Sequence, residues 1–106
     1  MKSHEFAIVQ TTTDTAEEAN RLASVAIEKQ LAACVQVSQI TSYYRWQGQA
    51  QHDPEFLLSF KTTGAAVEPV KDYLTTQHSY DEPEIIVLPI VDGSHGYLQW
   101  MTDSVS

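Results

Sequence analysis

Hydrophobic residues near the N-terminus follow first the spacing of a strand and then that of a helix. The segment from Glu5 to Thr12 is apolar and rich in β-branched residues, which predicts a strand. Asp14 and Glu17 resemble a capping box and predict the start of a helix that ends near Gln30. One face of that helix is apolar, with Ala19, Leu22, Ala23, Ala26 and Ile27 at helical spacing.

From Ala33 the hydrophobic period changes to two, which is typical of a strand. Residues that favour strands continue as far as Trp46, a long run for one strand. The polar segment 47–54, which contains Gly48, is expected to turn the chain into a second strand over residues 55–62. Half of the aromatic residues fall between positions 43 and 60, so we expect a long hairpin with aromatic cross-strand packing.

The last third of the chain predicts a helix, a strand and a short terminal helix. The second helix should begin near Ala66, because Pro69 is tolerated only in a first turn. A loop over residues 77–83 then leads to an apolar strand, 84–91. Pro89 cannot donate a ladder hydrogen bond, which places this strand at a sheet edge or a bulge. Ser94 is the predicted N-cap of the terminal helix.

This order of elements predicts an α+β domain over residues 1–106, with the ferredoxin-like βαββαβ plan and a C-terminal helix. The two helices would cover one face of a four-stranded antiparallel sheet. Segments 6–9 and 85–88 are nevertheless apolar at consecutive positions, so a second copy of the chain is the simplest cover for the other face. The alternative is that these are ordinary core strands with some exposed apolar residues.

Composition narrows the classes of function. The 106 residues are 42% hydrophobic and carry a formal net charge of −8, which disfavours nucleic acids and anionic membranes as partners. Cys34 is the only cysteine, so no disulfide forms within one chain. We expect Cys34 to be a buried small hydrophobe. With no apolar stretch typical of a signal peptide, these features predict a cytoplasmic protein.

The densest set of reactive polar residues is His78, Tyr80 and Glu84 on one predicted loop, with Lys61 as a further member. An imidazole and a carboxylate can ligate a divalent metal, so His78 and Glu84 are the predicted metal ligands. The alternative is structural: His78 would cap its helix, and Glu84 would pair with Lys61. The other histidines show no metal-ligand spacing.

No sequence motif identifies a reaction. Nucleophile elbows, phosphate-binding glycine loops and dinucleotide fingerprints are all absent from the sequence. An enzyme with His78 as general base, oriented by Tyr80 and Glu84, is therefore the least favoured hypothesis. We predict a protein without catalytic activity.

Several segments resemble the CutA divalent-cation tolerance family, in family order and from Phe6 to about Met101. They are Leu31 to Val35, Tyr43 to Gly48, Lys61 to Thr63, His78 to Glu84 and Tyr97 to Trp100. The resemblance implies a tight trimer built much like the PII signalling proteins, with sheets facing inward and edge strands pairing between subunits. It also implies a role in tolerance to copper and other divalent ions, with no assigned reaction.

The resemblance further implies a cleft between subunits that gathers Lys61, His78, Tyr80 and Glu84, with Trp46 nearby. Where the family's copper pattern has a cysteine and a first histidine, this chain has Gln10 and Gln77. Without a thiolate we expect only weak metal binding, around His78 and Glu84. The alternative function is a signalling module that binds a small anionic ligand, with Lys61 as the charge partner and Trp46 or Tyr80 as a stacking surface.

Overall fold

The computed structural model describes residues 5–106, which form one four-stranded antiparallel sheet in the order β2-β3-β1-β4. The elements in chain order are β1 (Phe6–Thr13), α1 (Ala16–Glu28), β2 (Cys34–Trp46), β3 (Gln49–Thr63), a 3-10 turn (Gly64–Ala66), α2 (Val67–Gln77), β4 (Ile86–Pro89) and α3 (His95–Ser104). This confirms the predicted α+β fold with a C-terminal helix.

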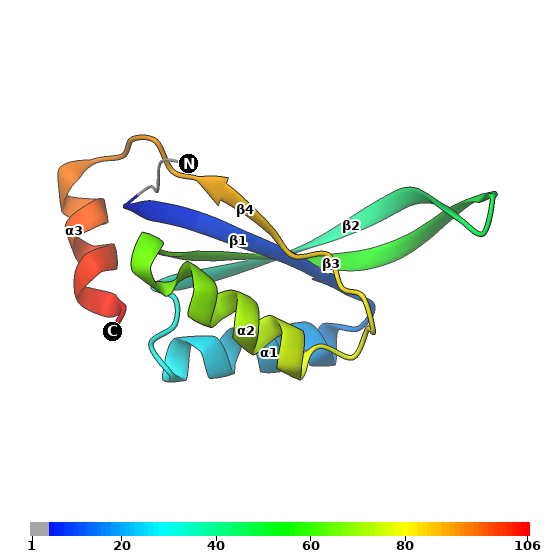
Figure 1. Cartoon of the computed structure of the whole chain (residues 1–106), viewed down its shortest axis with the longest axis horizontal. Coiled ribbons are helices and arrows are strands. Elements are labelled where there is room, and N and C mark those ends of the chain that lie inside the picture. The colour runs from blue at the N-terminus through cyan, green and yellow to red at the C-terminus, as the bar shows by residue number, and fades with distance from the viewer. Residues whose placement is uncertain (1–4) are drawn as a thin grey trace.

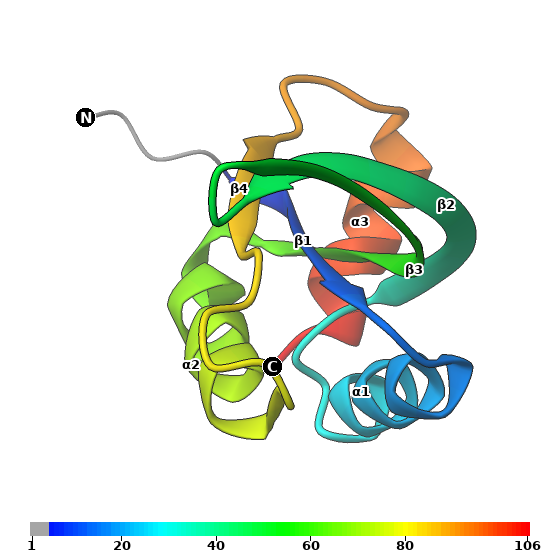
Figure 2. The same cartoon turned by 90° about the vertical axis from the view of Figure 1, so that its right-hand side faces the viewer.

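The core lies between the sheet and the pair of helices α1 and α2, which cover the same face (Figures 1 and 2). Residues at alternate positions of the strands are fully buried there, as period-two patterning requires. They pack against the apolar stripes of both helices. The buried cluster includes Val9, Leu58 and Phe60 from the sheet, Leu22 and Ala26 from α1, and Val70 and Leu74 from α2.

Helix α1 begins one residue later than the sequence predicted. The N-cap is Thr15, whose hydroxyl oxygen accepts a hydrogen bond from the Glu18 N–H at 3.1 Å. The predicted capping box at Asp14 and Glu17 is therefore wrong. The reason lies in the preceding strand: β1 continues to Thr13, and the Thr13 hydroxyl donates to the Thr15 carbonyl at 2.9 Å. Both threonines thus favour a cap at position 15.

The hairpin between β2 and β3 turns at only two residues, Gln47 and Gly48. Their φ angles are 50° and 77°, so both central residues lie in the left-handed region that tight two-residue hairpins need. The predicted polar turn over residues 47–54 is therefore wrong, because most of that segment pairs as strand, from Gln49 onward. Polar side chains are compatible with strand here because this part of the ribbon is exposed.

The outer part of this hairpin, residues 40–54, extends away from the rest of the chain and will be called the distal ribbon (Figure 1). Two strands alone are marginally stable in water. Large aromatic side chains nevertheless stand exposed on the distal ribbon: Tyr43 is 78% and Trp46 62% accessible. Within the described residues, Tyr43 stacks only on the His52 ring, with ring centroids 5.3 Å apart, and both side chains stay largely accessible.

Strand β4 lies at the edge of the sheet, paired only with β1, which confirms the predicted place of Pro89. It is shorter than the predicted 84–91, spanning Ile86–Pro89. Ile86, Val87 and Leu88 are each 40–45% accessible along this edge. Among residues 5–106, no helix is long and apolar enough to cross a membrane.

Candidate functional site

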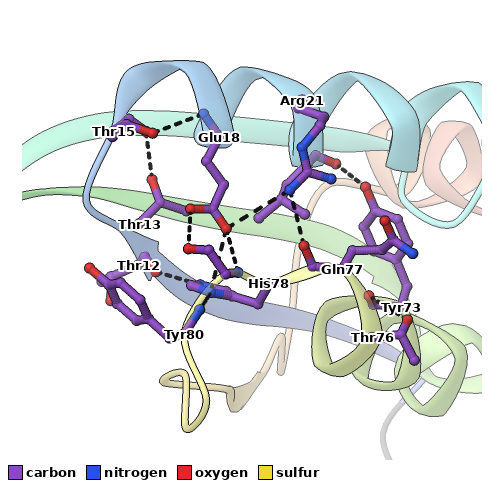
Figure 3. Close-up of polar contacts among 12 residues, drawn as sticks. Thr12, Thr13, Thr15, Glu18, Arg21, Tyr73, Thr76, Gln77, His78 and Tyr80 are labelled. Atoms are coloured by element: carbon purple, nitrogen blue, oxygen red, sulfur yellow. Dashed lines mark hydrogen bonds and ion pairs between the residues drawn. The ribbon is translucent and has the colours of Figure 1, made fainter.

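The loop that follows α2 is fastened to β1 by His78, whose side chain is fully buried. The ring Nε2 lies 2.7 Å from the Thr12 carbonyl oxygen, and Nδ1 lies 3.0 Å from the Tyr80 backbone nitrogen. A carbonyl can only accept and a backbone N–H can only donate, so the proton sits on Nε2 and Nδ1 is the acceptor. Both nitrogens of His78 are thus engaged within the chain (Figure 3).

Glu18 of α1 fastens the same loop from the other side. Its Oε2 accepts from the Ser79 backbone N–H at 2.8 Å, and its Oε1 accepts from the Ser79 hydroxyl at 2.7 Å. Burial by itself would raise the pKa of Glu18, but the two hydrogen bonds from Ser79, with help from Arg21, hold the pKa below its ordinary value. Glu18 therefore remains ionised, and Figure 3 shows it beside His78.

A depression of about 800 Å³ lies between the distal ribbon, the loop after α2 and the end of β1. The volume falls within the usual range for small-molecule sites. Four aromatic rings line it, those of Tyr43, Tyr44, Trp46 and Tyr80. Its other lining residues are Ser42, Pro54 and five carboxylates: Asp14, Asp53, Glu55, Glu82 and Glu84. Of the predicted site residues, the structure thus brings together Trp46, Tyr80 and Glu84.

Two of the tyrosines direct their hydroxyl groups at carboxylates of the depression. The Tyr80 hydroxyl donates to Glu55 Oε2 at 3.2 Å, and the Tyr44 hydroxyl donates to Asp53. Burial, followed by the negative charge of Asp14 and Glu55, raises the pKa of Tyr80. The hydrogen bond to Asp53 is the main cause that raises the pKa of Tyr44. Both phenols therefore stay neutral.

Lys61 does not join this depression. The ladder places it opposite Ile8 on one side and Cys34 on the other, about 20 Å along β3 from Glu55 at the usual strand rise. Its Nζ lies 5.6 Å from the centre of the Tyr97 ring of α3. Among residues 5–106, Lys61 therefore forms no ion pair with a carboxylate of the loop and does not lie beside Trp46.

The residues of one chain do not fit a tight copper site. Within residues 5–106, no group of three or more His, Cys, Asp or Glu side chains is arranged to hold a metal ion. The imidazole of His78 is engaged at both nitrogens, and Cys34 pairs opposite Lys61, away from the depression. For His78 to ligate a metal ion as predicted, its hydrogen bond to Thr12 or to Tyr80 would first have to break.

The carboxylates of β3 were missed from the sequence. Asp53 lies opposite Ser42, and Glu55 lies opposite Ile40, because the turn at Gln47 and Gly48 sets the register of the whole hairpin. A two-residue loop ending in glycine between strand-forming segments is the signal that would have revealed this pairing.

Comparisons with known proteins agree with this architecture. The sequence model of the CutA1 divalent ion tolerance protein matches residues 7–104, nearly the whole chain. The chain belongs to the CutA1 divalent ion tolerance family. The CutA protein of Thermus thermophilus is 41% identical over 98 residues, which cover 92% of this chain and 95% of that relative. The chloroplastic CutA protein of Arabidopsis thaliana is also 41% identical over 98 residues, 92% of this chain but 54% of that relative.

Solved CutA structures share the fold throughout. CutA from Synechococcus elongatus superposes with a TM-score of 0.94 at 38% identity, covering 100% of this chain and 95% of that chain. The periplasmic divalent cation tolerance protein CutA from Archaeoglobus fulgidus has a TM-score of 0.91 at 34% identity, covering 95% and 99% respectively. This chain spans about half the length of the Arabidopsis relative, whereas it spans almost all of the Thermus relative.

These names correct the predicted location. Members of the CutA1 family are described as chloroplastic and as periplasmic, which contradicts the cytoplasmic assignment. A single cysteine and a polar N-terminal stretch cannot distinguish these compartments, because a chain without disulfides folds in any of them. The family is described by tolerance to divalent ions and not by a reaction, so no catalytic activity is assigned.

Proposed function

We propose that this chain acts as a homotrimer in tolerance to divalent cations, copper included, and that it binds the cation weakly through carboxylates. The observation that carries this proposal is the convergence of five carboxylates on one depression, with no basic residue in its lining. Carboxylate oxygen is a suitable ligand for hard divalent ions. Glu84 belongs to this set, whereas His78 lies beneath it with its ring nitrogens occupied.

Weak binding is the expected outcome because the carboxylates come from separate elements and are not arranged as a chelating group. A net charge of −8 per chain raises the local concentration of cations without selecting among them. The proposed role is therefore that the protein binds divalent cations only when their concentration is high.

Isothermal titration of copper(II) into the assembled protein tests this proposal. Replacing Glu82 and Glu84 with glutamine should lower the copper affinity severalfold. The matched control, Glu28→Gln, alters an exposed carboxylate at the end of α1 and should leave the affinity unchanged. Equal heats from all three proteins, or no heat from the wild type, would contradict binding at the depression. If His78→Asn lost most of the copper affinity while its loop stayed ordered, His78 and not the carboxylates would be the metal ligand.

The trimeric state is supported by apolar surface that one chain leaves uncovered. Exposed large apolar residues occur on the distal ribbon, along β4, in the loop after β4 and on α3, including Tyr43, Trp46, Leu88, Val91 and Trp100. Surfaces of this kind are typical of interfaces between subunits. Edge strands β2 and β4 also carry backbone groups that a neighbouring subunit can pair with.

Sedimentation equilibrium at micromolar concentration should give three times the chain mass of 11.9 kDa. A monomer under these conditions would contradict the trimer and would leave the exposed aromatic residues of the distal ribbon unexplained.

A further inference from the structure

Among residues 5–106, one side-chain hydrogen bond joins the base of the distal ribbon to a segment outside the hairpin. In it the Tyr80 hydroxyl donates to Glu55 Oε2 at 3.2 Å, and Glu55 lies opposite Ile40, where the ribbon begins. The other side-chain hydrogen bonds and ring contacts of the ribbon stay within the hairpin, at Tyr44 with Asp53, Arg45 with Gly48 and Tyr43 with His52. Tyr80 is therefore placed to control the direction in which the ribbon leaves the sheet.

Tyr80 is in turn held by β1 and α1. Its backbone N–H donates to His78 Nδ1 at 3.0 Å, and the centroids of the two rings lie 4.8 Å apart. The buried His78 ring is bonded to the Thr12 carbonyl of β1 (Figure 3). The neighbouring Ser79 donates to Glu18 of α1. A continuous series of hydrogen bonds thus runs from these two elements through Tyr80 to the base of the ribbon.

The direction of the ribbon matters because the ribbon is long. Trp46 pairs with Gln49, about 20 Å beyond Glu55 at the usual strand rise. A tilt of about 10° at the base would therefore displace Trp46 by about 3.5 Å. A two-stranded ribbon is weakly held by itself and twists easily. Because apolar interfaces between subunits are packed as closely as protein interiors, a shift of this size would take Trp46 out of its contacts.

We propose that Tyr80 is a positioning residue for assembly: through Glu55 it sets the angle of the distal ribbon and thereby aligns Trp46 with the surface of a second copy of the chain. The inference rests on the proposed trimer, in which the exposed rings of the ribbon are covered. A second copy is the partner that the structure favours, because exposed apolar side chains also lie along β4 and on α3. One chain therefore offers both halves of the head-to-tail contact that a cyclic assembly needs.

Acrylamide quenching of Trp46 tests this inference. The chain has two tryptophans, so a Trp100→Phe background leaves Trp46 as the only indole. Trp46 is 62% accessible in the single chain and should be shielded in the assembled protein. If Trp100→Phe disturbs assembly, fluorotryptophan labelling resolves the two side chains by fluorine NMR without that substitution.

Tyr80→Phe keeps the ring and removes only the hydroxyl bond to Glu55. In the assembled protein it should raise the quenching constant of Trp46 severalfold. Sedimentation velocity over a dilution series should show dissociation at a concentration about threefold higher or more, the effect of one lost hydrogen bond.

Further variants separate positioning from general stability. Tyr73→Phe removes a hydroxyl bond of 2.8 Å to the Leu22 carbonyl, away from the ribbon, so it should lower the unfolding midpoint and leave Trp46 quenching unchanged. Glu55→Gln keeps an oxygen that accepts from Tyr80 and should behave nearly as wild type. Glu55→Ala removes the acceptor and should match Tyr80→Phe, and the double variant should lose no more than either one.

Several results would overturn the inference. Unchanged quenching in Tyr80→Phe would show that the ribbon keeps its direction without the bond, and an equal rise in Tyr73→Phe would mean general destabilisation. A loss in Glu55→Gln as large as in Glu55→Ala would assign the effect to charge. A wild type that sediments as a monomer would remove the proposed trimer together with this inference. A trimer in which Trp46 is not shielded, or does not respond to Tyr80→Phe, would remove this inference alone.

Discussion

Alternating apolar and polar residues form strands both in the distal ribbon and in the rest of residues 5–106, which will be called the body. The apolar side chains are buried in the body and exposed in the ribbon. In the body, alternate residues of β1 and β3 are buried against α1 and α2; Val9, Leu58 and Phe60 are fully inaccessible. In the distal ribbon, β2 and β3 still pair in register, but aromatic side chains remain exposed. Alternation predicts a strand in both places, whereas burial depends on what lies opposite.

This difference separates the residues that stabilise the fold from those that form the accessible surface of the depression. The body has a hydrophobic core within one chain, so substitutions of its core residues should lower the free energy of unfolding. The distal ribbon contributes little core, yet it provides most of the aromatic wall of the depression. Substitutions in the two regions should therefore affect different measurements.

The largest effect on folding should come from Phe60→Ala in the body. The side chain is fully buried, and its removal should lower the free energy of unfolding by about 3–5 kcal/mol through lost burial and the cavity left behind. Urea unfolding at one fixed protein concentration measures this. Tyr43→Ala in the distal ribbon is the comparison, because that side chain is 78% accessible in the single chain. Comparable losses from both variants would show that the ribbon also belongs to the folding core.

The next effect concerns assembly and should come from the distal ribbon. If the proposed trimer covers Trp46, then Trp46→Ser should weaken association by about 1.5–3 kcal/mol, the worth of burying one large apolar side chain. Sedimentation velocity over a dilution series should show dissociation at a concentration at least about tenfold higher than for wild type. An unchanged series would place the interface elsewhere.

The fastening at Glu18 predicts a loss of stability in acid. Its pKa is lowered in the folded protein from the ordinary value of 4.5, so the unfolded chain binds the proton more readily. The stabilisation is complete above about pH 4.5 and is lost as the pH falls through the folded-state value. Thermal melting between pH 6 and pH 3 should fall less steeply for Glu18→Gln than for wild type. Glu17→Gln, an exposed neighbour, should keep the steep wild-type fall.

The smallest effect should follow Gly48→Ala at the tip of the distal ribbon. No atom lies within 4 Å of an added Cβ, so the cost comes only from the backbone angle of +77°. About 1 kcal/mol is the expected loss. Amide hydrogen exchange should show it as faster exchange confined to the ribbon, with the body unchanged. Exchange that rises throughout the sheet would mean that ribbon and body open together.

The boundaries of the body could be read from the sequence because its signals are local. The apolar stripe of α1, the position of Pro69 in the first turn of α2 and the place of Pro89 on the edge strand each follow from one short segment. The start of α1 was missed by one residue because three neighbouring residues, Thr13, Asp14 and Thr15, are all capable caps.

The candidate site depended on long-range geometry instead. His78, Tyr80 and Glu84 are close in sequence, yet the structure buries the first as a fastening and places the other two around a depression. Which side chain faces inward is decided by Thr12 and Glu18, more than 55 residues away along the chain. No local pattern encodes those contacts.

The sequence by itself therefore determined the order of strands and helices, the long hairpin and the acidic character, since each depends on neighbouring residues or on composition. Tertiary structure alone decided that Asp53 and Glu55 join Tyr80 and Trp46, and that Lys61 does not. The physical reason is that the loop carrying Tyr80 is held by the long-range contacts of His78 with Thr12 and of Ser79 with Glu18, whereas the local turn at the hairpin tip fixes only which residues of β2 and β3 face each other.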